Sequence, residues 1–316
     1  MRTVGLANLG NTCFLNACLQ ALFQTTELAD ALGNKRIRSD IVNEWLQLYR
    51  TKSSMPNQFV ATVHRVAKDK GRDLFTGWSQ NDMPEFLLLM IECFHEAICR
   101  KVVINIKGTK ENPLDELAVQ CYKMFQDNYS KEYSDIIRLF YGIYVSELVS
   151  SSNVRQKPES FFVLDLPIPN RSASLYDCFD LYTASEELSG VYNETTKTKE
   201  TAEKRIRFWN FPTILVIVLK RFSADGRTKN GSLISCPLES LNLSKYVVGY
   251  NPNSYIYDLY AVCNHMSGIG GGHYTAFVKD NDQWLDCNDM SVRPIDLASV
   301  ISPMSYCLFY RKKIRA

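Results

Sequence analysis

The sequence contains ten cysteines but no Cys-x-x-Cys pair. It also lacks an apolar run long enough to cross a bilayer, since the longest, residues 211–219, is short and contains Pro212. No secretory signal leads into the first polar loop, so we expect a reducing, intracellular environment, cytoplasm or nucleus, with few or no disulfides. These features argue against a membrane-spanning chain and against a disulfide-stabilised secreted domain.

An excess of charge is also missing. Lys and Arg number 36 against 34 Asp and Glu, which gives a formal charge of +2. The basic residues are scattered apart from a short run at 311–313, so we expect neither a nucleic-acid partner nor a membrane surface. A hydrophobic fraction of 46% and a charged fraction of 22% are typical of a globular chain that buries a substantial core.

A polar, glycine-containing loop ends at Asn11 and Thr12 and leads into Cys13, where apolar residues begin to recur at helical spacing. Either polar residue is a credible N-cap, which places Cys13 in the first helical turn. Backbone N–H groups and the helix dipole favour a thiolate at that position. The alternative is that Cys13 is a small buried hydrophobe, the usual state of a free cysteine. The nucleophile hypothesis therefore requires a base elsewhere in the chain.

The first 140 residues are predicted to be mainly helical. Asp82 and Glu85 resemble a capping box at the start of a strongly amphipathic helix, although Pro84 leaves the cap position uncertain by a residue. Helical spacing predicts helices over residues 41–49, 59–67, 86–98 and 114–139.

Strands dominate the remainder of the chain. We expect a helix over 175–188 and a charged, exposed hairpin or mobile loop over 193–205. Strands are predicted over 161–166 and 213–222, followed by an antiparallel meander over 259–264, 274–279, 284–287 and 306–311. Helices first and strands later predict an α+β protein with two lobes and a cleft between them.

The chain has four histidines, of which His64 and His95 fall in predicted helices and are interpreted as structural. His273 follows three glycines and starts a strand, so a substrate chain could approach the backbone closely there. The alternative is a flexible hairpin whose histidine faces water. Asn288 or Asp289, at the end of the next strand, could orient the ring of His273. An early cysteine with His and Asn/Asp far downstream is the chain order of papain-like cysteine proteases.

Seven segments together resemble the ubiquitin-specific protease family of cysteine deubiquitinases. Residues 5–16 resemble its Cys box, and residues 260–265 and 271–277 resemble its His box. The His-box resemblance continues through 284–292 to 306–310, while residues 80–87 resemble the family's Gln-x-Asp-x-x-Glu-Phe-Leu helix start and 219–222 its Leu-Lys-Arg-Phe strand. The matches follow the family order along almost the whole chain.

The resemblance implies an α+β, papain-like cysteine protease fold of thumb, palm and fingers, with an antiparallel sheet in the palm. We expect a single catalytic domain over residues 1–316, with a mainly helical thumb over 1–140 and mainly β palm and fingers over 141–316. The fingers would occupy roughly 142–222. The implied reaction is hydrolysis of isopeptide or peptide bonds after the C-terminal Gly-Gly of ubiquitin, through an acyl-enzyme thioester. Ubiquitin and ubiquitinated proteins are the implied partners of a monomer that needs no cofactor.

By this resemblance Cys13 is the nucleophile, His273 the general base and Asn288 the third member of the triad. Asp289 falls on the neighbouring acidic position that assists, and Asn8 on the residue that supplies an amide N–H to the oxyanion hole. Carboxylates in the segment that begins the helix would attract an Arg-containing ubiquitin tail. The implied substrate-binding residues are Gln80, Asp82, Glu85, Gly271, Gly272 and Tyr274.

The sequence departs from the family in the fingers. Many members bind a structural zinc there through two Cys-x-x-Cys pairs, but residues 146–153 contain no cysteine, and Glu194 and Lys197 stand where the second pair would fall. Since zinc requires thiolate or imidazole ligands, we expect no metal.

Two alternatives to a deubiquitinase remain. One is a ubiquitin-binding module with weak or no turnover, and the other is a protease for another Gly-Gly-terminated modifier.

Overall fold

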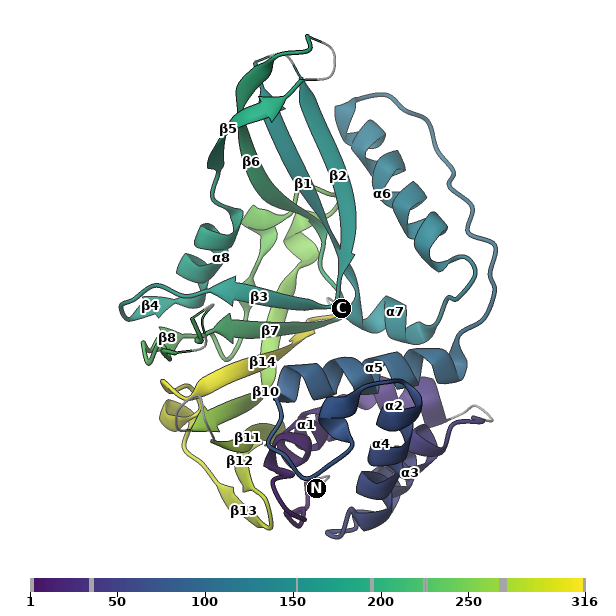
Figure 1. The fold of residues 1–316 in the computed structure, drawn as a ribbon, viewed down its shortest axis with the longest axis vertical. Helices are drawn as coiled ribbons and strands as arrows, with labels where there is room; N and C mark the ends of the chain where they lie inside the picture. Colours follow the sequence, from purple (N-terminus) through teal and green to yellow (C-terminus); the bar gives the residue numbers. More distant parts are fainter. Residues whose placement is uncertain are drawn as a thin grey trace.

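The computed structural model describes residues 3–33, 37–151, 153–193, 196–223, 225, 227–266 and 272–314. Most of the chain up to residue 98 forms a helical lobe, at the lower right of Figure 1. The elements up to the first strand are α1 (Cys13–Gln24), α2 (Thr26–Gly33), α3 (Asp40–Thr51), α4 (Asn57–Asp69), η1 (Asp73–Phe75), α5 (Met83–Ile98), α6 (Pro113–Tyr129) and α7 (Asp135–Phe140). Every residue of α1 is buried, so this helix is surrounded by protein on all sides.

A central sheet faces the helical lobe (Figure 1). Its strand order is β13-β12-β11-β10-β14-β7-β3, with β9 also paired to β10. The strands are β3 (Val163–Pro167), β7 (Ile214–Lys220), β9 (Leu241–Asn242), β10 (Ile256–Met266), β11 (His273–Asp280), β12 (Gln283–Asn288), β13 (Ser291–Pro294) and β14 (Ser305–Lys312). The meander predicted over 259–264, 274–279 and 284–287 is confirmed as β10, β11 and β12, and β13 continues it. The fourth predicted strand, 306–311, is β14, which pairs with β10 and β7 instead of following β12. Strand β3 pairs with β7 in parallel.

A second sheet projects away from the central sheet, with α6 alongside it (Figure 1). Its order is β2-β1-β6-β5. The elements are β1 (Gly142–Ser150), β2 (Val154–Phe161), β5 (Glu186–Tyr192) and β6 (Lys199–Asn210). The remaining elements are β4 (Ala173–Ser174), α8 (Leu175–Thr183), β8 (Ile234–Ser235), η2 (Ser244–Tyr246), η3 (Pro252–Ser254) and η4 (Leu297–Ser299).

Strand β7 explains how the core is divided. Ile214, Val216 and Val218 belong to a hydrophobic cluster shared with the helical lobe. The alternate residues Leu215, Ile217 and Leu219 belong to a second cluster on the opposite face, with α8. Both faces of the strand are covered, which is why its sequence is continuously apolar rather than alternating. The predicted central strand over 213–222 is confirmed.

Several predicted boundaries were wrong. The helix predicted over 114–139 is two helices, α6 and α7, because Ser134 caps a new helix by accepting from the Ile137 N–H. The helix predicted over 175–188 ends at Thr183, and β5 begins at Glu186. Part of the stretch 193–205, predicted as a charged, exposed hairpin or mobile loop, does belong to a hairpin, since from Lys199 onward it is strand β6, which pairs with β5. In the part of the chain that the structure describes, no helix has the length and apolarity that crossing a bilayer requires.

Candidate active site

Cys13 is the first residue of α1, where the central sheet meets the helical lobe. Thr12 occupies the N-cap position, but its side chain makes no capping hydrogen bond. Its hydroxyl instead accepts from the Leu9 N–H at 2.9 Å, and Asn11 adopts a left-handed conformation with φ of 54°. The prediction that Asn11 or Thr12 is the N-cap, with Cys13 in the first turn, is confirmed for Thr12 by position. Thr12 does not cap with its side chain, because its hydroxyl helps to close the loop before the helix.

The environment of Cys13 does not by itself favour a thiolate. Burial raises the pKa of its thiol, and the backbone N–H of Tyr274 opposes this by hydrogen bonding to the sulfur. The nearby charge of Asp289 raises the pKa further, while the N–H groups of Phe14 and Cys13 lower it. The N–H groups of the helix start thus act in the predicted direction but are outweighed by burial. A base is needed to take the thiol proton.

His273 begins β11, next to Tyr274, whose N–H reaches the Cys13 sulfur. Its Nε2 lies 2.7 Å from Oδ1 of Asn288, the last residue of β12. Because an amide oxygen only accepts hydrogen bonds, Nε2 must carry the proton in the neutral ring. The other nitrogen, Nδ1, is then left with a free lone pair and can act as a base.

Asp289 follows Asn288 in a turn, with a left-handed φ of 47°. Its Oδ2 lies 3.9 Å from the His273 Nε2 and accepts from the Asn8 side-chain amide at 3.0 Å. The Asn8 Oδ1 accepts from the backbone N–H groups of Gly10 and Thr12, each at 3.1 Å. The Asn8 amide is thereby held in one orientation, and its Nδ2 keeps a second N–H that Asp289 does not use.

The loop carrying Asn8 lies directly against the turn that carries Asp289. The Leu6 N–H donates to the Asp289 carbonyl at 2.9 Å. A Cβ atom on Gly5 would overlap the carbonyl oxygen of Met290, so no side chain fits at position 5 without a backbone shift. Two segments from opposite ends of the sequence are therefore joined by backbone contact as well as by the Asn8 side chain.

Most of the predicted substrate-binding residues lie together at the start of α5 and β11. The Gln80 Oε1 accepts from the Gly272 N–H at 2.8 Å. Asp82 accepts from the hydroxyls of Tyr274 at 3.3 Å and Tyr306 at 2.9 Å, and also from the Glu85 N–H as the N-cap of α5. The Glu85 side chain is exposed. Gly271 lies outside the described residues.

Asn16 is a residue of this region that the sequence interpretation missed. It is buried one turn into α1, and its Nδ2 donates to Oδ1 of Asp289 at 2.8 Å. The sequence does contain a pattern that could have indicated it, because the polar residues Asn16, Gln20 and Gln24 recur every four residues on an otherwise apolar helix. Buried amides at such spacing indicate a line of hydrogen bonds along one face.

The projecting sheet contains a polar cluster around residues 146–153, the first segment where zinc ligands would fall. Glu147 is 2% exposed and accepts from Gln156 at 2.8 Å, Arg205 at 2.8 Å and Arg207 at 3.2 Å. Nearer the β5–β6 turn, the buried Asn193 donates to Glu200 at 3.0 Å. Within the described residues, no group of three or more His, Cys, Asp or Glu side chains is arranged to hold a metal ion.

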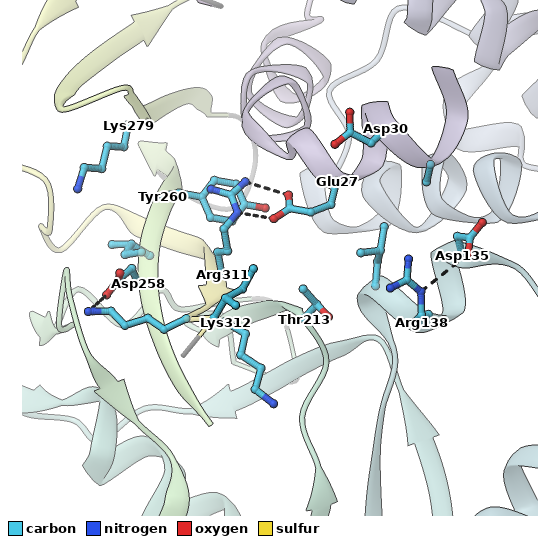
Figure 2. Close-up of a pocket in the computed structure, with 15 residues that line it drawn as sticks. Glu27, Asp30, Asp135, Arg138, Thr213, Asp258, Tyr260, Lys279, Arg311 and Lys312 are labelled. Atoms are coloured by element: carbon cyan, nitrogen blue, oxygen red, sulfur yellow. Dashed lines mark hydrogen bonds and ion pairs between the residues drawn. The ribbon is translucent and has the colours of Figure 1, made fainter. Parts of the chain in front are cut away.

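A separate hollow of about 1220 Å³ lies between α2, α7 and the ends of β10 and β14 (Figure 2). Its wall carries the ion pair between Glu27 and Arg311, with Nε 2.7 Å from Oε1, and a second pair between Asp258 and Lys313 at 3.1 Å. None of the predicted site residues lines it.

The sequence model of one family, described as ubiquitin carboxyl-terminal hydrolase, matches residues 4–310. The chain belongs to this family. Human ubiquitin carboxyl-terminal hydrolase 2 is 32% identical over 335 residues, which cover 97% of this chain and 54% of that protein. The chicken protein of the same name is 32% identical over 339 residues, covering 97% of this chain and 92% of that protein. Human ubiquitin carboxyl-terminal hydrolase 21 is 32% identical over 351 residues, covering 98% and 61%. The chain thus spans only about half to three-fifths of the length of the human relatives.

A solved structure of similar fold is the SAGA Ubp8/Sgf11/Sus1/Sgf73 DUB module bound to ubiquitin aldehyde. One of its chains superposes with a TM-score of 0.75 at 21% identity, covering 99% of this chain and 70% of that chain. A second structure, of a variant of the same module bound to monoubiquitin, gives a TM-score of 0.76 at 20% identity with the same coverage. The predicted α+β, papain-like fold is confirmed. We refer to the helical lobe as the thumb, the central sheet as the palm and the projecting sheet as the fingers. With these names β3 and β7, which fall within the predicted fingers range of 142–222, belong to the palm.

Proposed function

We propose that this protein is a thiol-dependent deubiquitinase that hydrolyses the isopeptide or peptide bond after the C-terminal Gly-Gly of ubiquitin. The observation that carries the proposal is the 2.7 Å hydrogen bond from His273 Nε2 to Asn288 Oδ1, which leaves Nδ1 as the base. Cys13 and His273 then act as a nucleophile–base pair oriented by a third residue. Family membership supports the reaction, and the arrangement of these side chains supports the roles.

In the first half-reaction, the Cys13 thiol gives its proton to Nδ1 of His273, and the thiolate attacks the carbonyl carbon of the terminal glycine. The developing oxyanion accepts hydrogen bonds from the Cys13 backbone N–H and from the second N–H of the Asn8 amide. One such donor contributes roughly 3 kcal/mol to the barrier reduction. The C–N bond then breaks, and the imidazolium protonates the departing amine.

In the second half-reaction, His273 removes a proton from water as the water attacks the Cys13 thioester. The C–S bond breaks, the thiol is restored with a proton from His273, and the ubiquitin carboxylate leaves. Since burial raises the pKa of Cys13, we assign removal of the thiol proton to His273. This makes His273 more important than the helix start for thiolate formation.

The ubiquitin tail would pass between the start of α5 and the start of β11. Glu85 offers an exposed carboxylate there, which suits the basic side chains of that tail. Asp82 is already engaged by Tyr274 and Tyr306, so we assign it to shaping the channel wall as well as to charge. The Gly272 N–H, bonded to Gln80 in the free protein, supplies a backbone donor for an extended peptide.

The decisive experiment uses ubiquitin carrying a C-terminal electrophile. Covalent capture is expected for the wild-type protein and for Cys99→Ala, since Cys99 is partly exposed and lies at the end of α5. Capture should be lost in Cys13→Ala. Persistent capture in that variant would contradict the nucleophile assignment.

Parallel reactions separate the other candidate functions. Binding of ubiquitin without hydrolysis of a ubiquitin C-terminal amide would identify a ubiquitin-binding module. Turnover of a different Gly-Gly-terminated modifier, with ubiquitin left intact, would identify a protease for that modifier. Hydrolysis of the ubiquitin amide at a rate that depends on Cys13 supports the proposal.

A further inference from the structure

Three buried amides on α1 hold the N-terminal segment against the helix. The Gln24 Nε2 donates to the Thr3 hydroxyl at 2.9 Å, and the Gln20 Nε2 donates to the Val4 carbonyl at 2.7 Å. The Asn16 Nδ2 donates to the carbonyls of Leu6 and Ala7, each at 3.3 Å. The three amides lie four residues apart, so they project from one face of α1. They attach residues 3–7 to α1 before the chain reaches Asn8.

Asn16 differs from the other two amides because it also reaches the C-terminal half of the chain. Its Nδ2 lies 2.8 Å from the Asp289 Oδ1, much closer than its 3.3 Å contacts with the two carbonyls. A charge-assisted hydrogen bond of this length is the strong one of the set. The two carbonyls then share the remaining N–H.

The Asp289 carboxylate is consequently held from two sides. Asn16 binds Oδ1, and Asn8 binds Oδ2 at 3.0 Å. Oδ2 is also the atom 3.9 Å from the His273 Nε2. Rotation of the carboxylate would therefore do two things at once. It would move Oδ2 away from the Asn8 amide, and it would change the distance between the negative charge and the His273 imidazole. Only 3% of Asn16 is exposed, so water cannot easily replace its N–H groups.

We propose that Asn16 is a positioning residue for the reaction, which it affects by fixing the Asp289 carboxylate between Asn8 and His273. The proposal rests on the function proposed above. Asn16 acts through Asp289 and is not itself a catalytic residue. Gln20 anchors the same segment without contacting Asp289 and therefore serves stability.

Gln20 provides a matched control for this proposal. Both side chains are buried amides on α1 that donate to the N-terminal segment, and the amide oxygen of each is buried without a hydrogen-bond partner. Replacing either with leucine removes a donor and introduces an apolar side chain of similar size. A merely structural role predicts similar losses in the two variants, whereas the positioning role predicts a catalytic loss for Asn16 alone.

The first test compares kcat and KM of Asn16→Leu and Gln20→Leu on a ubiquitin C-terminal amide. We expect Asn16→Leu to lower kcat about 10- to 100-fold, as small misplacements of reacting groups do. Its KM should stay within about threefold of the wild-type value. Gln20→Leu should lower the melting temperature but keep kcat. Equal kcat for Asn16→Leu and Gln20→Leu would overturn the proposal. Asn16→Ala, which leaves room for a water, provides the same comparison if the leucine variant does not fold.

A double-mutant cycle with Asp289→Ala tests the route of the effect. If Asn16 acts through Asp289, the loss caused by Asn16→Leu should largely disappear in the Asp289→Ala background. If the kcat loss of the double variant equals the product of the two single-variant losses, Asn16 acts by another route and the proposal is overturned.

A measurement without ubiquitin separates failure of this proposal from failure of the proposed function. Alkylation of Cys13 by iodoacetamide at neutral pH should be slower in Asn16→Leu than in Gln20→Leu. The reason is that the Asp289 charge, which raises the pKa of Cys13, loses a compensating donor. Equal alkylation rates would contradict the Asn16 proposal even if the wild-type protein cleaved no ubiquitin substrate. Wild-type inactivity combined with the expected alkylation difference would contradict only the proposed reaction.

Discussion

The imidazole of His273 is held by a neutral oxygen, Oδ1 of Asn288, at 2.7 Å. The nearest carboxylate, that of Asp289, stands 3.9 Å from the same nitrogen and is bound by Asn8 and Asn16. Orientation of the ring and supply of negative charge are thus divided between neighbouring residues. This division predicts that the two residues have separable roles.

Asn288→Ala should reduce kcat for a ubiquitin C-terminal amide by about 10- to 100-fold, because the ring loses the acceptor that fixes its tautomer. Steady-state kinetics provides the measurement. Asp282→Ala, in the exposed turn between β11 and β12, is the matched control and should retain wild-type kcat. An Asn288→Ala enzyme with wild-type kcat would mean that the ring is oriented by another residue.

Asp82→Asn should change how stability depends on pH. Burial raises the pKa of Asp82 above its ordinary value of 3.8, and hydrogen bonds from Tyr306, Glu85 and Tyr274 only partly oppose this. Proton binding therefore favours the folded state. The stabilisation is fully present below about pH 3.8 and is lost as the pH rises through the folded-state pKa.

The asparagine variant keeps an N-cap side chain but does not titrate. The free energy of unfolding of wild type minus that of Asp82→Asn should therefore decrease as the pH rises above about 3.8 and then level off. Denaturant unfolding at a series of pH values measures this difference. A constant difference across the acidic range would contradict the prediction.

Glu147→Gln should destabilise the fingers at neutral pH by about 1–3 kcal/mol, because Arg205 and Arg207 lose their shared carboxylate. Burial opposes ionisation of Glu147, but hydrogen bonds from Gln156 and Arg205 and the two arginine charges hold its pKa below the ordinary 4.5. The stabilisation is present above pH 4.5 and is lost as the pH falls through the folded-state pKa. The difference in the free energy of unfolding between wild type and Glu147→Gln should therefore decrease in acid.

Glu159 supplies the control for that variant. It lies in the same sheet and pairs with Lys157 at 2.8 Å, but it is 37% exposed and the lysine 79%. Glu159→Gln should cost less than about 1 kcal/mol, as exposed pairs do. Equal costs for the two variants, measured by denaturant unfolding, would show that burial of Glu147 is not what matters.

Chelation should have no effect on this protein. Prolonged treatment with EDTA is expected to leave the melting temperature and the kcat unchanged, because residues 146–153 contain no cysteine or histidine and Glu194 and Lys197 offer no thiolate or imidazole. Elemental analysis of the purified protein is the second measurement. Stoichiometric zinc, or a clear fall in melting temperature after chelation, would contradict the prediction.

The sequence predicted the parts of the fold whose patterns are local. Strand β7 and the meander strands β10 and β11 were identified because they are buried on both faces and therefore appear as short runs of apolar, β-branched and aromatic residues. Strand β1 was missed because Glu147 and Ser146 make its sequence polar. The Glu147 carboxylate is neutralised by Arg205 and Arg207 of β6, which is the neighbouring strand in the sheet but lies far along the sequence.

The contact between Asn288 and His273 was predictable from the order of the strands, but the contacts that involve the N-terminal loop were not. Nothing in the sequence pairs Asn8 with Asp289, because the two come together only when the N-terminal segment lies on the turn after β12. The direction of the Cys13 pKa shift could not be predicted either. Burial, which is a property of the whole fold, raises this pKa more than the local N–H groups lower it. The regular spacing of Asn16, Gln20 and Gln24 is visible in the sequence. The sequence does not show that Asn16, alone among the three, contacts the Asp289 carboxylate.

The close approach of Gly5 to Met290 gives a way to inactivate the enzyme by shape alone. A methyl group at position 5 would collide with the Met290 carbonyl and act as a wedge between the two ends of the sequence. Gly5→Ala would separate Asn8 from Asp289 while every reactive group kept its chemical identity. Such a protein would retain the thiol and the imidazole but lose their alignment, which makes it a tool for measuring how much of the rate comes from alignment.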